Sequence, residues 1–374
     1  MNTHEKFNLI TKNCEEVMTE QDLKKYLSRG IPIKHYIGFE ISGRIHLGTG
    51  LVCMQKIKDF SDAGCKVNIF LADWHTWIND KLSPDREKIK KIANGYFKQG
   101  LKIVFKILGG DPAKLNFILG SNLYDENKNY WPQVVEVAKN TTLSRAKRSI
   151  SILGRDEGDD VDFAKLIYPM MQVADIFTMG INLSHAGCDQ RKAHVIARQV
   201  AKKITISPLV YHYHNIKPIG IHHKLLLGLQ KPTQWPIPKN ANIKDLIASM
   251  KMSKSNPDSA VFIDDSPQDI SRKIQKAFCP EKEIQYNPIL DWAEQLIFSR
   301  EKEITILRDS KYGGDLTFTS FEKLQNSYQK GELHPQDLKN FVSNYLIELL
   351  KPARDYFHQG AGKRYFSELT MLSS

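Results

Sequence analysis

The sequence lacks several features that would place it in a common class. Its first residues, MNTHEKFNLITKNCEE, do not form a basic-then-apolar signal, and no apolar run approaches membrane-spanning length. Its five cysteines are scattered and form no CxxC pair, which argues against a disulfide framework or a thiolate zinc site. No GxGxxG motif occurs, so a dinucleotide-binding fold is disfavoured. These absences predict a cytoplasmic protein without a membrane partner or a bound metal.

The composition is that of a globular protein with basic character. The chain has 374 residues, of which 41% are hydrophobic and 25% are charged, and this length suggests two domains or three. The formal net charge is +11, which favours a polyanionic partner such as a nucleic acid. Charge alone does not identify that partner.

Short apolar segments alternate with amphipathic ones over the first two thirds of the chain. HYIGFEI (35–41), KVNIFLA (66–72) and KLNFILG (114–120) are typical of buried strands. Helices are predicted between them, at 46–64 and from the Ser83 cap to residue 97. This rhythm predicts an α/β fold with a Rossmann-like parallel sheet, whose ligands bind beyond the carboxyl ends of the strands.

From Ser266 onward the pattern is mostly helical. SPQDISRKIQKAF (266–278), DWAEQLIF (291–298) and residues 337–357 are predicted helices. We therefore predict a catalytic domain over 1–265, with an insertion at 211–250, and a smaller α-helical domain over 266–374.

Two short motifs carry the chemistry. GFEISGRIHLGTG (38–50) is a strand, a turn and a helix start, and by itself it is equally typical of a plain strand-to-helix turn. KMSKS (251–255) has no hydrophobic period, and by itself it is typical of a solvated loop. The chain has HLG near its first strand and KMSKS after its last. This pair, in this order, resembles the signature of the class I aminoacyl-tRNA synthetases.

In that family the KMSKS lysines reach the triphosphate of ATP. An ionised amino-acid carboxylate attacks the α-phosphorus, so positioned cations and hydrogen-bond donors suffice and no general base is needed. The resemblance implies catalytic roles for His46, Gly48, Lys251 and Lys254. The implied ATP-binding residues are Gly38, Glu40, His46, Gly48, Thr49, Lys251, Met252, Ser253, Lys254 and Ser255.

One predicted helix, 163–180, is apolar over most of its circumference but has a polar stripe. Tyr168, Gln172 and Asp175 follow each other at helical spacing. The spacing leaves open whether the stripe faces solvent or forms the wall of a pocket for a polar ligand.

A longer series of motifs resembles the archaeal and eukaryotic-type tyrosyl-tRNA synthetases. It runs in order through YIGFEISGRIHLG (36–48), FLADWH (70–75), TTLSRAKRS (141–149), IYPMMQVADI (167–176), GCDQRK (187–192), KMSKS, KYGGDL (311–316) and ELHPQDLKN (332–340). The resemblance implies a homodimer that activates L-tyrosine with ATP and Mg²⁺, without a tightly bound prosthetic group, and then transfers tyrosine to tRNA(Tyr).

The resemblance also implies site residues. Tyr36 and Asp175 would hold the substrate phenol, and Tyr168, Gln172 and Gln190 the α-amino group and its surroundings; Gly38, Ala72 and His75 complete the set. Arg148, Arg191 and Lys192 would approach the acceptor end of tRNA. Tyr312 and His334 would stack on anticodon bases and Asp337 would form a hydrogen bond to one; from the residues alone, ordinary turn and helix-cap packing is the favoured interpretation of Tyr312 and His334.

Two segments depart from the family pattern. Thr49 stands where a second histidine is common, and a threonine brings a hydroxyl donor but no imidazolium. The segment 211–250 is long, and its histidines (His212, His214, His222 and His223) have no clear metal-ligand spacing, so no metal is predicted.

Two other functions stay open at this stage. Tryptophanyl-tRNA synthetase shares both signatures, but an indole offers only a hydrogen-bond donor, which the Tyr36 and Asp175 pair would not match as well. A catalytically silent, RNA-binding relative is disfavoured by the intact KMSKS lysines and His46.

Overall fold

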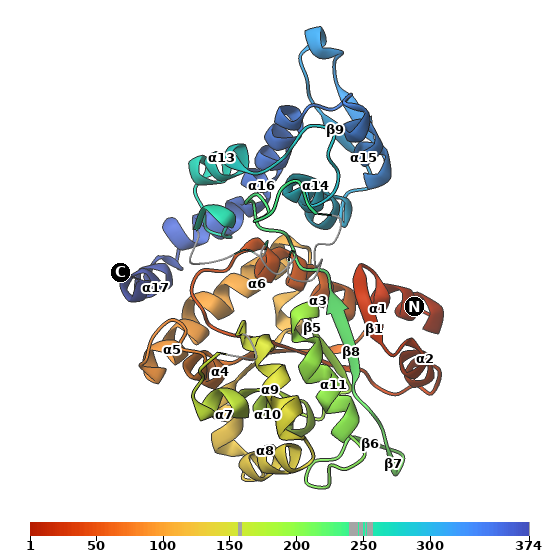
Figure 1. The fold of residues 1–374 in the computed structure, drawn as a ribbon, viewed down its shortest axis with the longest axis vertical. Coiled ribbons are helices and arrows are strands. Elements are labelled where there is room, and N and C mark those ends of the chain that lie inside the picture. The colour runs from red at the N-terminus through yellow and green to blue at the C-terminus, as the bar shows by residue number, and fades with distance from the viewer. Residues whose placement is uncertain (156–158, 239–245, 247–249, 251, 253–256, 374) are drawn as a thin grey trace. The chain divides into compact units, whose positions relative to one another are not determined.

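The structure, a computed structural model, describes residues 1–155, 159–238, 246, 250, 252 and 257–373 (Figure 1). It divides into two compact units. Unit 1 comprises residues 1–43, 55–224 and 367–374, and unit 2 comprises residues 44–54 and 225–366. The turn that contains His46 is thus grouped with the residues from Leu225 onward. The functional division at Asp265 stays a prediction.

Unit 1 is built on a mostly parallel sheet, as predicted. In the described residues its strands are β1 (Cys14–Met18), β2 (Lys34–Phe39), β3 (Lys66–Leu71), β4 (Asn116–Leu119), β5 (Leu183–Gly187) and β8 (Ile219–His223). They lie in the order β1-β8-β5-β2-β3-β4, with every pair parallel except β1 with β8. Strand β8 lies inside the segment 211–250, so this part of the predicted insertion belongs to the central sheet.

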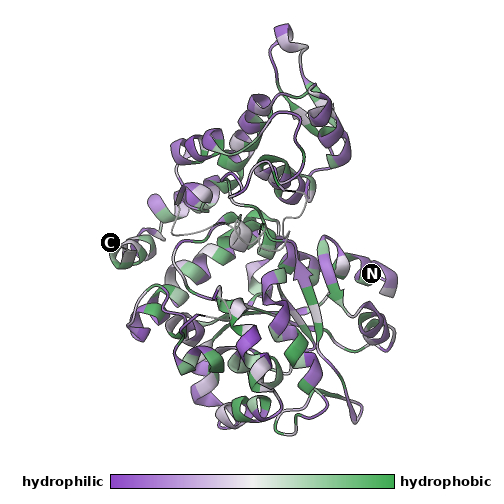
Figure 2. Cartoon of the chain, in the orientation of Figure 1, coloured by the Kyte–Doolittle hydropathy of each residue, from purple (hydrophilic) through white to green (hydrophobic). Residues whose placement is uncertain are grey.

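Helices pack around this sheet, and Figure 2 shows hydrophobic and hydrophilic segments alternating along them. They are α1 (Thr3–Thr11), α2 (Glu20–Ser28), α3 (Cys53–Asp62, which begins in unit 2), α4 (Asp73–Ile78), α5 (Arg86–Ile92), α6 (Lys98–Ile107), α7 (Gly120–Glu126), α8 (Tyr130–Lys139), α9 (Leu143–Ser149), α10 (Phe163–Thr178) and α11 (Arg191–Val200), with a π-helical turn η2 (Ala93–Phe97), 3-10 turns at η3 (Pro112–Lys114), η4 (Ile150–Leu153) and η5 (Cys188–Gln190), and a hairpin of β6 (Val210–Tyr211) and β7 (His214–Asn215).

Side-chain caps fix where several helices begin. The Asp162 side chain accepts a hydrogen bond from the backbone N–H of Lys165, which starts α10 at Phe163 as the sequence predicts. The predicted start at Ser83 is wrong, because the Asp85 side chain accepts from Glu87 N and Lys88 N and so becomes the cap of α5. Ser83 and Asp85 lie two residues apart and are both good capping residues, so the sequence leaves this boundary ambiguous.

Unit 2 is mostly helical, as predicted for the C-terminal part of the chain. Its described elements are η1 (Gly48–Val52), η6 (Pro257–Ser259), α13 (Pro267–Lys276), α14 (Pro288–Trp292), η7 (Ala293–Phe298), β9 (Ile304–Ile306), η8 (Ser310–Tyr312), β10 (Leu316–Phe318), α15 (Phe321–Lys330) and α16 (Pro335–His358), and α17 (Lys363–Ser373) begins in it. Strands β9 and β10 form a short antiparallel pair. No helix among the described residues is long and apolar enough to cross a membrane.

A row of buried histidines crosses the middle of the main sheet. His35 Nε2 lies 3.3 Å from His185 Nδ1, and His185 Nε2 lies 2.8 Å from His223 Nδ1. All three side chains are buried, and the His35 ring packs against Phe60 at a centroid distance of 4.7 Å. Burial lowers the pKa of His35 to about 3 and that of His223 to about 4, because a charged imidazole would lose its hydration.

These histidines predict a loss of stability in weak acid. Below about pH 6.5 these histidines become protonated in the unfolded chain but stay neutral in the folded chain. The difference persists until the pH reaches the folded pKa values, about 4 for His223 and about 3 for His35. The free energy of unfolding should therefore fall across this window, by up to about 1.4 kcal/mol per pH unit for each histidine. Denaturant unfolding at a series of pH values measures the slope, and His35→Gln should make it shallower.

Phe60→Leu is the matched control, because it disturbs the same packing without removing a titrating group. It should lower the free energy of unfolding at every pH and keep the slope of the parent protein. An equal slope in His35→Gln and the parent would contradict the assignment of this acid sensitivity to the histidine row.

Candidate active site

Several predicted site residues lie at or just after the carboxyl ends of neighbouring parallel strands. Gly38 and Glu40 lie at the end of β2, Ala72 and His75 follow β3, and Gln190 follows β5. Neighbouring parallel strands end at the same edge of a sheet, where α/β proteins bind their ligands. The fold therefore brings residues distant in sequence to one edge of unit 1.

Asp175 lies at the centre of an aromatic cluster in this unit. The Tyr130 hydroxyl donates to Asp175 Oδ1 at 3.0 Å, and His75 Nε2 lies 3.8 Å from Asp175 Oδ2. The Tyr124 ring stacks on Tyr130, with centroids 3.8 Å apart. Tyr36 is buried too, and its phenol lies close enough to feel the Asp175 charge.

Burial controls the protonation of this cluster. Desolvation raises the pKa of Asp175 well above its usual range, and the Tyr130 hydroxyl bond offsets part of that effect. Desolvation and the nearby Asp175 charge raise the pKa of Tyr36, so this phenol keeps its proton. Desolvation lowers the pKa of His75 to about 3, which leaves a neutral imidazole. The cluster offers hydrogen bonds rather than a cation.

The other two members of the polar stripe also have partners. The Tyr168 hydroxyl donates to Glu40 Oε1 at 2.8 Å, and the Asn79 amide donates to the same oxygen at 2.9 Å. Gln172 Nε2 lies 3.5 Å from Gln190 Oε1. The stripe thus connects α10 to the residues that follow β2 and β5.

The burial of this stripe answers the question that its spacing left open. Tyr168 and Asp175 are buried, and Gln172 is half-buried, so the stripe faces the interior of unit 1 rather than solvent. Asp175 Oδ2 and Gln172 Oε1 have no hydrogen-bond partner among the described residues. Buried polar atoms are normally paired, so these two acceptors indicate a site for a ligand that donates hydrogen bonds.

Gly38 keeps the backbone beside Tyr36 clear. A Cβ atom at residue 38 would lie 2.7 Å from the Tyr36 hydroxyl oxygen and would displace the phenol. Gly38 does not adopt a left-handed backbone conformation, so the reason for a glycine at this position is the closeness of the Tyr36 ring.

The predicted ATP-binding residues His46, Gly48 and Thr49 lie in unit 2. His46 Nδ1 lies 3.3 Å from the backbone N of Thr49, and His46 Nε2 lies 3.3 Å from the Thr49 hydroxyl. A Cβ atom on Gly48 would approach the His46 ring to 3.0 Å, so the glycine leaves room for the imidazole. Thr49, at the position of the family's second histidine, thus contacts the first one.

The KMSKS motif falls largely outside the described residues. Lys251, Ser253, Lys254 and Ser255 belong to the undescribed part of the chain, while Met252 is described and half-buried. The predicted roles of these residues stay predictions from the sequence.

The three cations predicted to approach tRNA lie on neighbouring helices of unit 1. Arg148 and Lys192 are exposed, and Lys192 Nζ donates to the Arg148 carbonyl at 2.7 Å. Arg191 forms a two-bond ion pair with Glu16. No pattern in the sequence points to Glu16. It lies on β1, and the long-range pairing of β1 with β8 brings it to Arg191.

The predicted anticodon residues lie at the end of one short helical turn and at the start of a long helix in unit 2. Tyr312 is 64% exposed at the end of η8, with Lys311 Nζ 4.9 Å from its ring centre. His334 caps α16, because its Nδ1 accepts from Gln336 N at 3.1 Å, and Asp337 lies in the first turn of that helix. His334 thus has the capping role that its position also allowed.

Tyr130 and Tyr124 were missed by the sequence analysis. Both lie in SNLYDENKNYWPQ (121–133), where no periodic pattern or motif points to the Asp175 carboxyl. A surface hollow of about 750 Å³ begins beside them and is lined by Trp131, Pro132, Val135, Glu136, Lys139, Asn140, Lys203, Thr205 and Ile206, none of which belongs to the predicted site. The described residues contain no cluster of three or more metal-ligating side chains.

Comparison with known proteins agrees with this geometry. The family model of the class I tRNA synthetases (W and Y) matches residues 28–351. The chain is 56% identical to the tyrosine–tRNA ligase of Thermococcus sibiricus and 55% identical to that of Pyrococcus abyssi, in each case over 96% of both chains.

Solved structures give the same result. A tyrosyl-tRNA synthetase from Pyrococcus horikoshii, complexed with L-tyrosine, superimposes with a TM-score of 0.95 at 52% identity, over 99% of this chain and 100% of that one. A tryptophanyl-tRNA synthetase from Aeropyrum pernix gives a TM-score of 0.64 at 16% identity over 94% of this chain and 84% of that one, which shows a shared fold alone. The chain belongs to the class I tRNA synthetases (W and Y), in the branch of the tyrosine–tRNA ligases.

Proposed function

We propose that the chain joins L-tyrosine to tRNA(Tyr) in two steps, through a tyrosyl-adenylate. The observation that carries this proposal is the buried polar stripe of α10, which ends in a carboxyl oxygen without a partner among the described residues. A phenol both donates and accepts hydrogen bonds, so it can satisfy Asp175 and Tyr36 together. An indole can only donate, and phenylalanine would leave both polar groups unpaired.

The other pocket residues take roles that follow from their contacts. Tyr168, Gln172 and Gln190 hold the α-amino group, supported by the acceptor at Gln172 Oε1 and the nearby Glu40 carboxylate. His75, neutral at physiological pH, lies 3.8 Å from Asp175 Oδ2 without supplying a charge. Gly38 and Ala72 bring no bulky side chain to the substrate ring.

Adenylate formation depends on electrostatic stabilisation rather than on a general base. The tyrosine carboxylate attacks the α-phosphorus of ATP, and the charge that develops on the phosphate oxygens is met by His46, the amides near Gly48, and Lys251 and Lys254. Mg²⁺ enters as an ion held by the ATP phosphates, a binding mode typical of this ion. This chemistry fits the cytoplasm, and none of the five cysteines forms a disulfide.

Pocket specificity can be tested by amino-acid-dependent ATP–pyrophosphate exchange. We expect exchange with tyrosine and negligible exchange with tryptophan or phenylalanine. Asp175→Asn keeps the size of the side chain but replaces one acceptor oxygen with an NH2 donor, so the kcat/KM for tyrosine should fall on the order of a hundredfold, while the KM for ATP changes little.

Asp59→Asn is the matched control, since Asp59 is also a buried carboxylate of unit 1 and has its contacts with Gln55 and Lys56. It should keep the specificity of the parent protein. Exchange with tryptophan at a rate comparable to tyrosine, or an Asp175→Asn variant with parental kinetics, would contradict the proposed pocket.

Transfer to tRNA uses a different set of residues. We propose that Arg148, Arg191 and Lys192 contact the acceptor end, and that Tyr312, His334 and Asp337 contact the anticodon. The exposure of Tyr312 supports a stacking role, because an aromatic ring that contacts water can stack on an unpaired base.

Tyr312→Ala should separate the two half-reactions. Removing a stacking ring typically costs about 1–3 kcal/mol of binding, so the KM for tRNA should rise by roughly tenfold or more. Tyrosine-dependent pyrophosphate exchange, which needs no tRNA, should stay at the parental rate. Aminoacylation and exchange measured side by side give both values.

Tyr213→Ala provides the control, because Tyr213 is a fully exposed tyrosine of unit 1 without a proposed role. It should leave both reactions unchanged. Equal losses of exchange and aminoacylation in Tyr312→Ala would mean that this residue does not act through tRNA.

We further propose that the chain forms a homodimer through helices α8, α9 and α10. Val135 is 65% exposed, Leu143 is 63% exposed and Phe163 is 74% exposed, and of the helices that carry them α8 and α9 both pack against α10. Apolar side chains gathered on one region of a surface are typical of protein–protein interfaces.

Val135→Asp and Phe163→Asp should shift the protein from dimer to monomer, because a dimer would have to bury each new carboxylate. Sedimentation velocity at micromolar concentration measures the mass. Leu307→Asp, which changes an exposed leucine of unit 2, should keep the parental mass. Dimers of unchanged stability in both interface variants would contradict this surface.

A further inference from the structure

The turn that contains His46 is paired with the segment that follows the KMSKS motif in the sequence. Leu47 N donates to the Val261 carbonyl at 3.0 Å, and Ile263 N donates to the Ile45 carbonyl at 3.0 Å. His46 and Phe262 form an antiparallel bridge between these bonds. All these residues belong to unit 2, so the backbone fixes His46 in register against 261–263.

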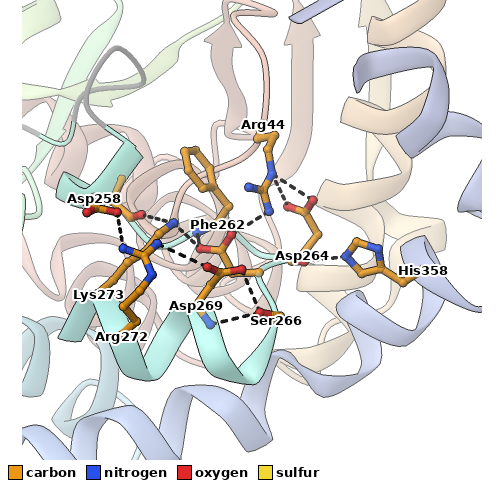
Figure 3. Close-up of polar contacts among 11 residues, drawn as sticks. Arg44, Asp258, Phe262, Asp264, Ser266, Asp269, Arg272, Lys273 and His358 are labelled. Carbon is orange, nitrogen blue, oxygen red and sulfur yellow. Dashed lines mark hydrogen bonds and ion pairs between the residues drawn. The ribbon is translucent and has the colours of Figure 1, made fainter. Parts of the chain in front are cut away.

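Arg44 holds this pairing from one side (Figure 3). Its Nε donates to Asp264 Oδ2 at 3.0 Å, and its Nη2 donates to Asp265 Oδ1 at 2.8 Å. Its guanidinium also lies over the Phe262 ring, 4.5 Å from the ring centre. The Arg44 side chain, two positions before His46, thus contacts three residues of the opposite segment.

The two carboxylates have further partners that fix their positions. Lys273 Nζ donates to Asp265 Oδ2 at 2.7 Å and to the Ala260 carbonyl at 2.9 Å. The same Asp265 oxygen accepts from Phe262 N, and His358 Nε2 lies 2.8 Å from the Asp264 carbonyl oxygen. Asp264, Asp265 and Lys273 are each at most 3% exposed, whereas the Arg44 side chain is 30% exposed, so the network has two buried anions, one buried cation and one cation that reaches them from the surface.

Stability alone does not explain a buried network of this kind. Buried ion pairs can often be replaced by apolar side chains of similar volume without loss of stability, and their best-attested use is to specify one arrangement among several. Here the arrangement specified is the register of 45–47 against 261–263. A planar guanidinium suits this role, because its fork can engage two carboxylates at fixed angles.

We propose that Arg44 is a positioning residue for adenylate formation. It acts through the Asp264 and Asp265 carboxylates to hold His46 in one register against residues 261–263, so that the imidazole meets the ATP phosphates in a fixed position. This inference rests on the proposed function for its reaction. It adds to that function a residue whose side chain need not touch the substrate.

The test compares Arg44→Gln and Arg44→Lys with the parent in ATP–pyrophosphate exchange, with ATP and tyrosine each varied. Misplacing a catalytic element slightly can cost on the order of a hundredfold in rate, so kcat for Arg44→Gln should fall about tenfold to a hundredfold. The KM for tyrosine should change by less than about twofold, because the pocket residues belong to unit 1. Arg44→Lys should recover part of kcat, since a lysine keeps the charge but not the fork.

A double variant separates positioning from stability. Arg44→Gln alone leaves the Asp264 carboxylate buried without this partner, and Arg44→Gln combined with Asp264→Asn removes that charge as well. The double variant should therefore regain thermal stability while its kcat stays low. Recovery of kcat together with stability would show that Arg44 supports only folding, and would overturn the proposal.

Arg308→Gln is the matched control in the same unit. Arg308 donates to the carbonyls of Gly314 and Glu332 and contacts neither segment of the network, so the variant should lose stability and keep its kcat. A parental kcat in Arg44→Gln would also overturn the proposal. Absence of tyrosine-dependent exchange in the parent protein would instead contradict the proposed function, so the two failures are distinguishable.

Discussion

Burial of polar side chains is the constraint on which the interior of unit 1 depends. Water does not reach the Asp175 carboxyl, so each of its oxygens needs a partner from the protein or from a ligand. Tyr130 supplies one partner, and the second oxygen has none among the described residues. A pocket of this kind selects its ligand by what it would leave unsatisfied, which discriminates a phenol from a phenyl ring far better than added apolar contact does.

The same constraint explains the histidine row in the sheet. His35, His185 and His223 come from three strands, and each hydrogen bond between them requires one ring to donate and the next to accept. Neutral imidazoles can do this, whereas protonated ones cannot, because both nitrogens would then be donors. These histidines therefore belong to the core of the fold. His223 lies within 211–250, the segment predicted to be an insertion, and its place in the sheet depends on the pairing of β5 with β8, a long-range contact that no local pattern shows.

Local patterns predicted the parts of the fold that depend on local physics. Strands β2, β3 and β4 and helices α10, α13 and α16 follow from apolar periodicity and side-chain caps, and their predicted ranges differ from the observed ones by a few residues. The antiparallel edge strand β1 was missed, because CEEVM has no alternation of apolar and polar residues and is held by its pairing with β8. The site divides in the same way: the Tyr168, Gln172 and Asp175 stripe is visible in the sequence, while Tyr130 and Glu16 reach their partners only through the tertiary fold.

The Arg44 network shows why the rest of the candidate site could not be predicted from the sequence. In the sequence, Arg44 is one cation in a turn, and Asp264 and Asp265 are two acidic residues before a capped helix; exposed charges of this kind contribute little to a fold. Their meaning changes once the backbone pairs 45–47 with 261–263, because the carboxylates then lose water and must be compensated. The two signature motifs are separated by roughly two hundred residues, so no local pattern could link them. Ion pairs to two buried carboxylates hold the His46 turn in register with the segment that follows the second motif, and this places a requirement on residue 44 that neither motif contains.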